Sequence, residues 1–278
     1  MMKNDPQTLQ DALNGDIQAF QVLFGEFHEA LKSYLYRMTA SRADAEDMAH
    51  DTFIRAFDKL HTFRQDASLK TWVFQIATNL TYSFLKKRNR WTEEVSEEAK
   101  RLVMITPALA QELSHTNQHS PYGRYEIKEH IDTCFTCLSK TLPIQQQVAL
   151  LLKDMYDFSV KEIMTIMEVT EGQAKYYLQA ARQSLTDIFD QRCALVNKQG
   201  ICHQCSELNG WLNPKQDQQA AKMALQLVKD AENKDKKALF EMRVALVKGI
   251  DPLRSPGHEL QGALMKCNRI AMGESVLE

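Results

Sequence analysis

Two helix-start signals lie only eleven residues apart in the segment FSVKEIMTIMEVTEGQAKYYLQAAR, residues 158–182. Ser159-x-x-Glu162 and Thr170-x-x-Gln173 are both capping boxes, in which a hydroxyl accepts an orphan backbone N–H and the residue three positions on reaches back. The first helix must therefore end near Met167. Two short helices joined by a corner of about three residues are typical of a helix-turn-helix.

The rest of the chain also favours helix. Gly and Pro are few, at 10 and 7 of 278 residues, and 44% of the residues are hydrophobic. No alternation of β-branched and polar residues is long enough to predict a sheet. We therefore predict an all-α protein with more than one core.

Composition shifts divide the chain into four predicted segments. Apolar residues recur at three- and four-residue steps in the first and third segments, whereas SHTNQHSPYG in the second is polar and typical of a linker. The segments are a helical body over 1–90, a linker over 91–130, a helix-turn-helix body over 131–192 and a cysteine-containing helical extension over 193–278. We expect the two bodies to be separate.

Charge and hydropathy limit the function classes. The polar start of the sequence has no apolar core of a secretory signal, and no run of about 18 apolar residues predicts a membrane span, so we expect a cytoplasmic protein without membrane insertion. The net charge of −2 argues against a free-standing, tight nucleic-acid binder. Local basic patches remain compatible with binding beside a larger partner.

The strongest such patch is KKRNR, which follows an aromatic helix pattern. Cations beside aromatic rings suit a single nucleic-acid strand, because phosphates need positive charge and unstacked bases need flat faces. The alternative is a helix end whose cations complement the helix dipole. The cations of this patch are Lys86, Lys87, Arg88 and Arg90.

Two further patterns point to binding surfaces. Asp44, Asp47 and Asp51 share one helix face, which is either a solvated face or a docking surface for a basic partner. In a DNA-reading helix-turn-helix, the start of the second helix faces base edges. Here that turn carries Glu171, Gln173, Lys175, Tyr176 and Tyr177, with Arg182 further along for a phosphate. The alternative is a helical hairpin that binds nothing.

The cysteines form two C-x-x-C pairs, Cys134/Cys137 and Cys202/Cys205. Two such pairs can supply four thiolates to a structural zinc ion, and the same thiols could form a redox switch. The first pair also fits small core positions on a helix. We favour zinc slightly, and the three alternatives stay open.

Taken in order, these patterns resemble a bacterial RNA polymerase sigma factor of the extracytoplasmic-function group. DAEDMAHDTFIRAFDKL followed by LKTWVFQIATNLTYSFLKKRNR is similar to the family's region 2, and LSKTLPIQQQVALLLKDMYDFSVKEIMTIMEVTEGQAKYYLQAARQSL is similar to its region 4. The family pattern has no counterpart for the residues after Arg192.

The resemblance implies a role for each surface and no catalytic residue. The acidic face would dock on core RNA polymerase, and residues 170–182, beginning with Thr170, would bind the duplex −35 element. The helix ending in KKRNR would capture the melted −10 element, with Lys70, Trp72 and the family-matching Asn79 as further contacts. An anti-sigma factor is a further implied partner.

Two departures from the family weaken the expected −35 contact. Glu168 stands where the family often has Gly at the corner, and Tyr177 and Ala180 stand where Arg is common. Fewer cations predict weaker phosphate attraction. A stand-alone helix-turn-helix regulator is the main alternative function, and a metal-dependent enzyme using the cysteines is a weaker one. The extension is expected to pack on the main body or to regulate it.

Overall fold

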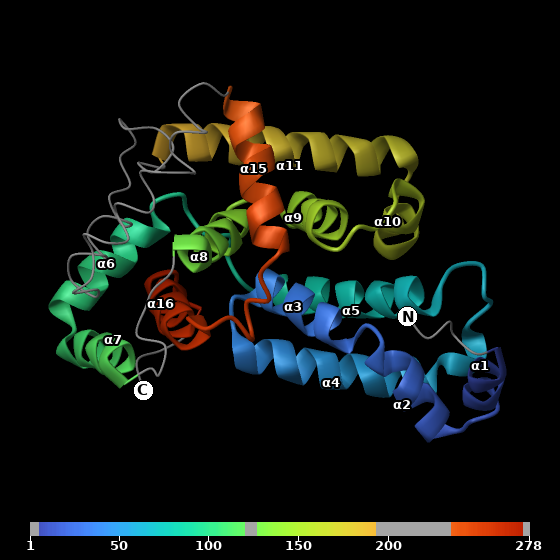
Figure 1. The fold of residues 1–278 in the computed structure, drawn as a ribbon. Coiled ribbons are helices and arrows are strands. Elements are labelled where there is room, and N and C mark those ends of the chain that lie inside the picture. Colours follow the sequence, from blue (N-terminus) through green and yellow to red (C-terminus); the bar gives the residue numbers. More distant parts are fainter. Residues whose placement is uncertain (1–5, 120–126, 193–234, 275–278) are drawn as a thin grey trace.

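The computed structural model describes residues 6–119, 127–192 and 235–274, which are built from helices (Figure 1). These three ranges contain no strand, so the all-α prediction is confirmed for them. Within the same ranges, none of the helices combines the length and the apolar character that a membrane span requires.

The first body forms because polar caps separate its apolar helices. Ser41 Oγ accepts the Asp44 N–H at 3.3 Å, and Ser68 Oγ accepts the Thr71 N–H at 3.0 Å, so each serine begins a helix. The elements are α1 (Pro6–Leu13), α2 (Ile17–Gly25), α3 (His28–Thr39), α4 (Arg42–Asp58), the short 3₁₀ turn η1 (Leu60–Thr62) and α5 (Leu69–Leu85).

The buried part of α5 is wider than one apolar stripe. Val73, Phe74 and Ala77 are fully buried, whereas Trp72 and Ile76 are half-buried. The reason is that α5 packs against α4 on one side and against α10 of the second body on another. A helix covered on two sides needs more than one apolar stripe.

The predicted linker contains two helices, α6 (Val95–Ile105) and α7 (Pro107–His119). Ala99, Leu109 and Leu113 of this pair pack against Leu260 and Leu264 near the end of the chain. The pair therefore has a small core of its own. Its short apolar stripe is interrupted by charges, which is why composition alone indicated a linker.

The second body contains the two predicted helix starts. Ser159 Oγ accepts the Glu162 N–H at 3.3 Å while the Glu162 carboxylate accepts the Ser159 N–H at 2.8 Å, so this capping box is present. Glu168 at the corner has φ +56°, which costs roughly 1 kcal/mol without glycine. The elements are α8 (Ile127–Ser139), α9 (Ile144–Leu150), the π-helical turn η2 (Leu151–Met155), α10 (Val160–Met167) and α11 (Glu171–Arg192).

The described part of the extension consists of α15 (Lys236–Lys248) and α16 (His258–Ala271). α15 packs on α8 and α11, and α16 lies between the α6–α7 pair and α8 (Figure 1). Phe240, Val247 and Leu260 are buried in these contacts. The described part of the extension thus packs on the main body, which is one of its two expected roles.

The two bodies are packed together rather than separate. Their buried residues form one hydrophobic cluster, in which the rings of Phe74 and Phe158 lie 4.9 Å apart and those of Tyr34 and Tyr156 lie 5.7 Å apart. α5 packs on α10 and α3 packs on η2, so region-spanning contacts contribute to the burial of both elements. The expectation of separate bodies is therefore not met in this conformation.

Candidate nucleic-acid interface

The start of α11 faces outward. Gln173 N–H donates to Thr170 Oγ1 at 3.3 Å and Thr170 N–H donates to Gln173 Oε1 at 2.9 Å, which completes the second predicted capping box. Glu171, Gln173 and Lys175 are exposed, and Tyr176 is 61% exposed. Lys175 pairs with Glu171 at 2.6 Å. This first turn can meet a DNA groove without any rearrangement of the fold.

The other two residues predicted to contact the duplex are engaged inside the protein. Tyr177 is half-buried and packs against the shared core. Arg182 Nε donates to Asp154 Oδ2 at 2.9 Å, and its second bond to the same carboxylate makes the pair bidentate. A phosphate would have to compete with Asp154 for this guanidinium.

The predicted strand-binding helix α5 is partly accessible. Asn79, Lys86 and Lys87 are exposed. Lys70 lies over the Phe158 ring, with Nζ 4.7 Å from its centroid, and Trp72 packs on Phe63 with ring centroids 5.3 Å apart. The exposed positions could therefore contact a strand directly, whereas Lys70 and Trp72 are tied to neighbouring rings.

The last two cations of the patch are held by intramolecular partners. Arg88 lies 4.1 Å over the Phe84 ring and 3.5 Å from Asp44. Arg90 Nη2 donates to Gln147 Oε1 at 2.6 Å, and burial lowers its pKa to about 10, which leaves the guanidinium charged at neutral pH. Only half of the predicted basic patch is therefore available to a ligand in this conformation.

Helix α10 covers one face of α5. Thr71 Oγ1 donates to Glu162 Oε1 at 3.1 Å, and Gln75 Nε2 donates to Glu168 Oε1 at 2.9 Å. Hydrogen bonding to Ser159 and Thr71 lowers the pKa of Glu162 against the opposing effect of partial burial, so Glu162 is ionised as an acceptor. The helix-turn-helix and the strand-binding helix are therefore in direct polar contact.

The acidic face of α4 is split between two environments. Asp47 and Asp51 are exposed, whereas Asp44 is paired with Arg88 at 3.5 Å and with Arg269 of α16 at 3.3 Å. Two of the three predicted docking carboxylates can thus meet a partner. The third is occupied by the extension.

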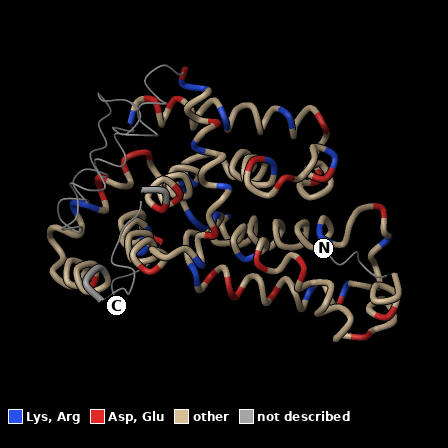
Figure 2. Tube along the Cα trace, viewed as in Figure 1, with Lys and Arg blue, Asp and Glu red and all other residues tan. Residues whose placement is uncertain are grey.

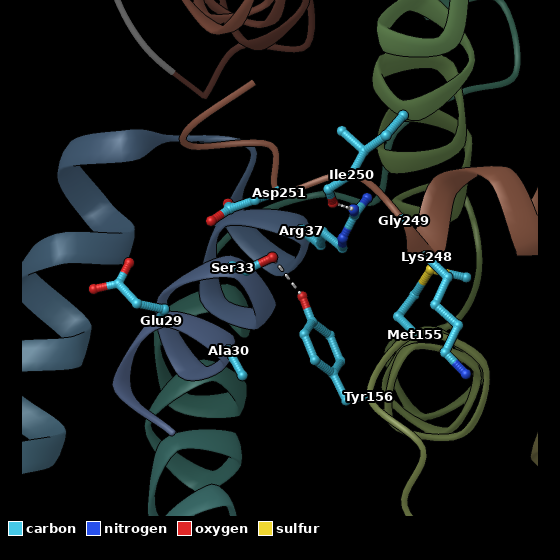
Figure 3. A pocket seen from close by; sticks show the side chains of 10 residues that line it. All are labelled: Glu29, Ala30, Ser33, Arg37, Met155, Tyr156, Lys248, Gly249, Ile250 and Asp251. Atoms are coloured by element: carbon cyan, nitrogen blue, oxygen red, sulfur yellow. Dashed lines mark hydrogen bonds between the residues drawn. The ribbon is translucent and has the colours of Figure 1, made fainter. Parts of the chain in front are cut away.

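Sequence reasoning missed the charged junction between the bodies. Arg37 of α3 is 2% exposed, and its Nη1 donates to Asp132 Oδ1 of α8 at 2.5 Å. Its Nη2 donates to the carbonyl of Ile250 at 3.1 Å, and Tyr156 donates to Ser33 beside it at 2.9 Å (Figure 3). Arg37 stands in an apolar run of α3, and a lone charge among buried residues was the signal that could have marked it.

No large basic face accompanies these contacts among the described helices. Lys and Arg are interspersed with Asp and Glu along them (Figure 2). This arrangement agrees with the net charge of −2. Electrostatic attraction alone would give such a surface little affinity for DNA.

Only part of the predicted zinc site lies in the described residues. Cys134 is half-buried, and Cys137 is 2% exposed with Asn268 Nδ2 donating to its sulfur at 3.5 Å. Cys202 and Cys205 lie outside the described residues. In the described ranges no three His, Cys, Asp or Glu side chains are grouped to hold a metal. Zinc bound by both pairs stays a prediction, which metal analysis of protein purified without chelator would test.

Comparisons with known proteins match both bodies. Two family models fit the chain, Sigma-70 region 2 over residues 23–91 and Sigma-70, region 4 over residues 133–185. The RNA polymerase sigma-H factor of Pseudomonas aeruginosa is 24% identical over 183 residues, which are 66% of this chain and 92% of that protein. The ECF RNA polymerase sigma factor SigM of Bacillus subtilis is 29% identical over 158 residues, 57% of this chain and 87% of that protein.

One solved structure is also similar. It is the sigma factor RpoE in complex with the anti-sigma factor NepR from Bartonella quintana, at 21% identity and a TM-score of 0.43. The similarity covers 61% of this chain and 95% of the solved one.

Proposed function

The chain belongs to the extracytoplasmic-function sigma factors of the sigma-70 family, and we propose that it directs core RNA polymerase to specific promoters and helps to melt them. The observation that carries the proposal is the pairing of a region 2 with a region 4 in one chain, because a simple repressor needs no region 2. The polymerase would perform the chemistry, so the chain itself is not an enzyme. A cytoplasmic location follows from this role.

Each surface has a distinct task in this proposal. The first turn of α11, with Lys175 and Tyr176, reads the −35 duplex in the major groove. Asn79, Lys86 and Lys87 of α5 contact the melted −10 strand. Extruding a base costs a few kcal/mol of stacking, which contacts to the base and to the phosphates must offset.

Run-off transcription with purified core polymerase tests the function. We expect transcripts from a defined subset of promoters only when this chain is added. A clean shift of duplex DNA with no need for polymerase would favour the stand-alone regulator instead. An absence of both transcripts and core binding would contradict membership in an active initiation complex.

The acidic face can be tested separately. We expect Asp47→Ala to weaken binding to core polymerase, because the exposed carboxylate would lose a basic partner. Glu46→Ala is the matched control, since Glu46 is an exposed carboxylate on the same helix that points about 100° away from Asp47 and the acidic face. Titration of labelled protein with core polymerase measures both. Equal affinities for the two variants would remove Asp47 from the docking surface.

A further inference from the structure

The end of α16 turns a carboxylate back into the protein. Glu274 N–H donates to the Arg269 carbonyl at 2.8 Å, and Gly273 N–H donates to the Ile270 carbonyl at 3.0 Å. These two bonds make a Schellman motif, whose left-handed position is Gly273 with φ +70°. The chain therefore reverses after α16, and the Glu274 side chain is 3% exposed.

Glu274 lies at the centre of a buried charge cluster. Trp91 Nε1 donates to its carboxylate at 2.8 Å, Lys140 Nζ lies 3.2 Å from it and Arg88 Nη1 lies 3.7 Å from it. Arg269 adds a second carboxylate to the cluster by pairing with Asp44 at 3.3 Å. We call the five charged residues the ionic latch; they are Asp44, Arg88, Lys140, Arg269 and Glu274.

The ionic latch joins all three parts of the chain. Asp44 and Arg88 belong to region 2, Lys140 precedes α9 of region 4, and the remaining two residues belong to the extension. Lys140 is fully buried, and it also donates to the Thr39 carbonyl at 3.0 Å. Asp44 and Glu274 each pair with cations from more than one part of the chain. Region 2, region 4 and the extension therefore cannot separate without breaking these ion pairs.

The ionic latch also occupies two predicted functional residues. Arg88 is a predicted phosphate contact, and the Glu274 carboxylate offers it oxygens of the kind that a phosphate would. Asp44 is a predicted docking residue for polymerase, and the Arg269 guanidinium stands where a basic partner would. The extension therefore forms ion pairs with the same side chains that the −10 strand and the polymerase would contact.

Other contacts of the extension also reach both regions. Arg254 pairs with Glu29 of region 2 at 2.8 Å, whereas Lys248 pairs with Asp157 of region 4. Arg243 stacks over the Phe189 ring of α11 at 3.8 Å. The carbonyl of Ile250 accepts from Arg37 at the junction. The extension thus contacts α3 of region 2 and, in region 4, both α11 and the turn before α10.

We propose that residues 235–274 form an intramolecular clamp that holds region 2 and region 4 closed and competes with core polymerase and the −10 strand. The competition rests on the proposed function, whereas the closure itself does not. A clamp of this kind lowers apparent affinity in proportion to the open fraction. Breaking the ionic latch therefore raises affinity for polymerase instead of lowering it.

The test compares two single substitutions on the extension. Glu274→Gln removes the central charge of the ionic latch. Glu259→Gln makes the same charge change at an exposed position of α16 and serves as the control. We expect Glu274→Gln to bind core polymerase about tenfold more tightly than the wild type, and Glu259→Gln to bind equally. The same titration with a labelled single-stranded oligonucleotide should show the same order.

Hydrogen exchange gives a readout that does not depend on polymerase. In Glu274→Gln the amides of α10 should exchange faster, because α10 separates from α5, while Glu259→Gln leaves them unchanged. Unchanged exchange overturns the clamp. Faster exchange without tighter polymerase binding overturns the competition. If the wild type and every variant fail to bind polymerase, the proposed function fails, and exchange still decides the closure.

A second variant covers the case in which Glu274→Gln does not fold. Lys248→Gln/Arg254→Gln removes two bridges between the extension and the two regions, and both cations are exposed. Exposed bridges contribute little to folding, so this protein should fold, and we expect about two- to fivefold tighter polymerase binding. Weaker or equal binding, with α10 exchange as in the wild type, overturns the clamp.

Discussion

The helices α5 and α11 are both predicted to contact promoter DNA, but their exposure differs. The first turn of α11 is open, with Tyr176 61% exposed. α5 is covered by α10 along one face, and Arg88 at its end is engaged by Asp44 and Glu274. The first turn of α11 can thus contact an intact duplex without rearrangement. On α5, Asn79, Lys86 and Lys87 are exposed, whereas Arg88 must leave Asp44 and Glu274 before it can contact a melted strand.

The difference has a physical cause. α11 needs only a capped first turn, which local sequence provides. α5 lies in the shared core, and its accessibility depends on long-range contacts to region 4 and the extension. Changes to those long-range contacts should therefore affect α5 and leave the first turn of α11 unaffected.

The largest effect is expected from Arg37→Met. Removing this guanidinium leaves Asp132 buried without its partner and the Ile250 carbonyl without its donor. Breaking one side of a buried pair typically costs about 3–5 kcal/mol in the free energy of unfolding. Urea unfolding followed by circular dichroism measures it. Arg55→Met, an exposed control on α4, should change stability by about 0.5 kcal/mol or less. If both variants lost the same free energy of unfolding, the contacts of Arg37 would not be what stabilises the junction.

Acid should destabilise the fold through His130 of α8. Burial, and then the nearby Arg243 charge, lower the pKa of His130 to about 4 from an ordinary value of 6.5. The folded protein therefore binds fewer protons than the unfolded chain between these values. His130 contributes stability that is complete above pH 6.5 and is lost as the pH falls toward 4, by up to about 3 kcal/mol.

The variant His130→Gln isolates this contribution. It cannot titrate, so the fall in its free energy of unfolding between pH 7 and pH 4.5 should be smaller than that of the wild type. Urea titrations at the two pH values give the difference, in which the carboxylates common to both proteins cancel. Parallel pH profiles for the two proteins would contradict the lowered pKa.

A smaller effect is expected at the turn that positions Glu274. Gly273 has φ +70°, where a side chain costs roughly 1 kcal/mol, so Gly273→Ala should lower stability and loosen the ionic latch. Gly262→Ala, on the same helix with open space around it, should raise stability by about 0.5–1 kcal/mol. Thermal unfolding distinguishes the two signs. A stabilised Gly273→Ala would mean that the turn is not needed.

Local patterns predicted the helices and missed what joins them. Both capping boxes follow from a spacing of three residues, and the structure contains them. The pairing of Arg37 with Asp132 spans 95 positions, and nothing in local sequence ties one to the other. The helices inside the predicted linker over 91–130 were missed for a related reason, since α6 and α7 pack on α16 from the far end of the chain.

The predicted binding residues show the same division. Spacing places Glu171 and Lys175 on the outer face of α11, because capping fixes where the helix begins. Spacing could not reveal that Arg182 binds Asp154 or that Arg88 pairs with Glu274. The sequence does not show whether an arginine binds a carboxylate of the protein or a phosphate of DNA. Charge pattern therefore predicts which residues can bind DNA, and tertiary contacts decide which are available.

The smallest effect is expected on the open side of the comparison, from Lys175→Ala. Lys175 is exposed on α11 and already paired with Glu171, so its loss should leave stability unchanged and remove one phosphate contact. The slope of log affinity for duplex promoter DNA against log salt should become shallower by about one unit. Fluorescence anisotropy of the holoenzyme on duplex DNA measures it, with exposed Lys237→Ala of α15 as the control. Because α11 needs no opening, the change should be the same with the Glu274→Gln background as without it; a dependence on that background would mean that the clamp also restrains α11.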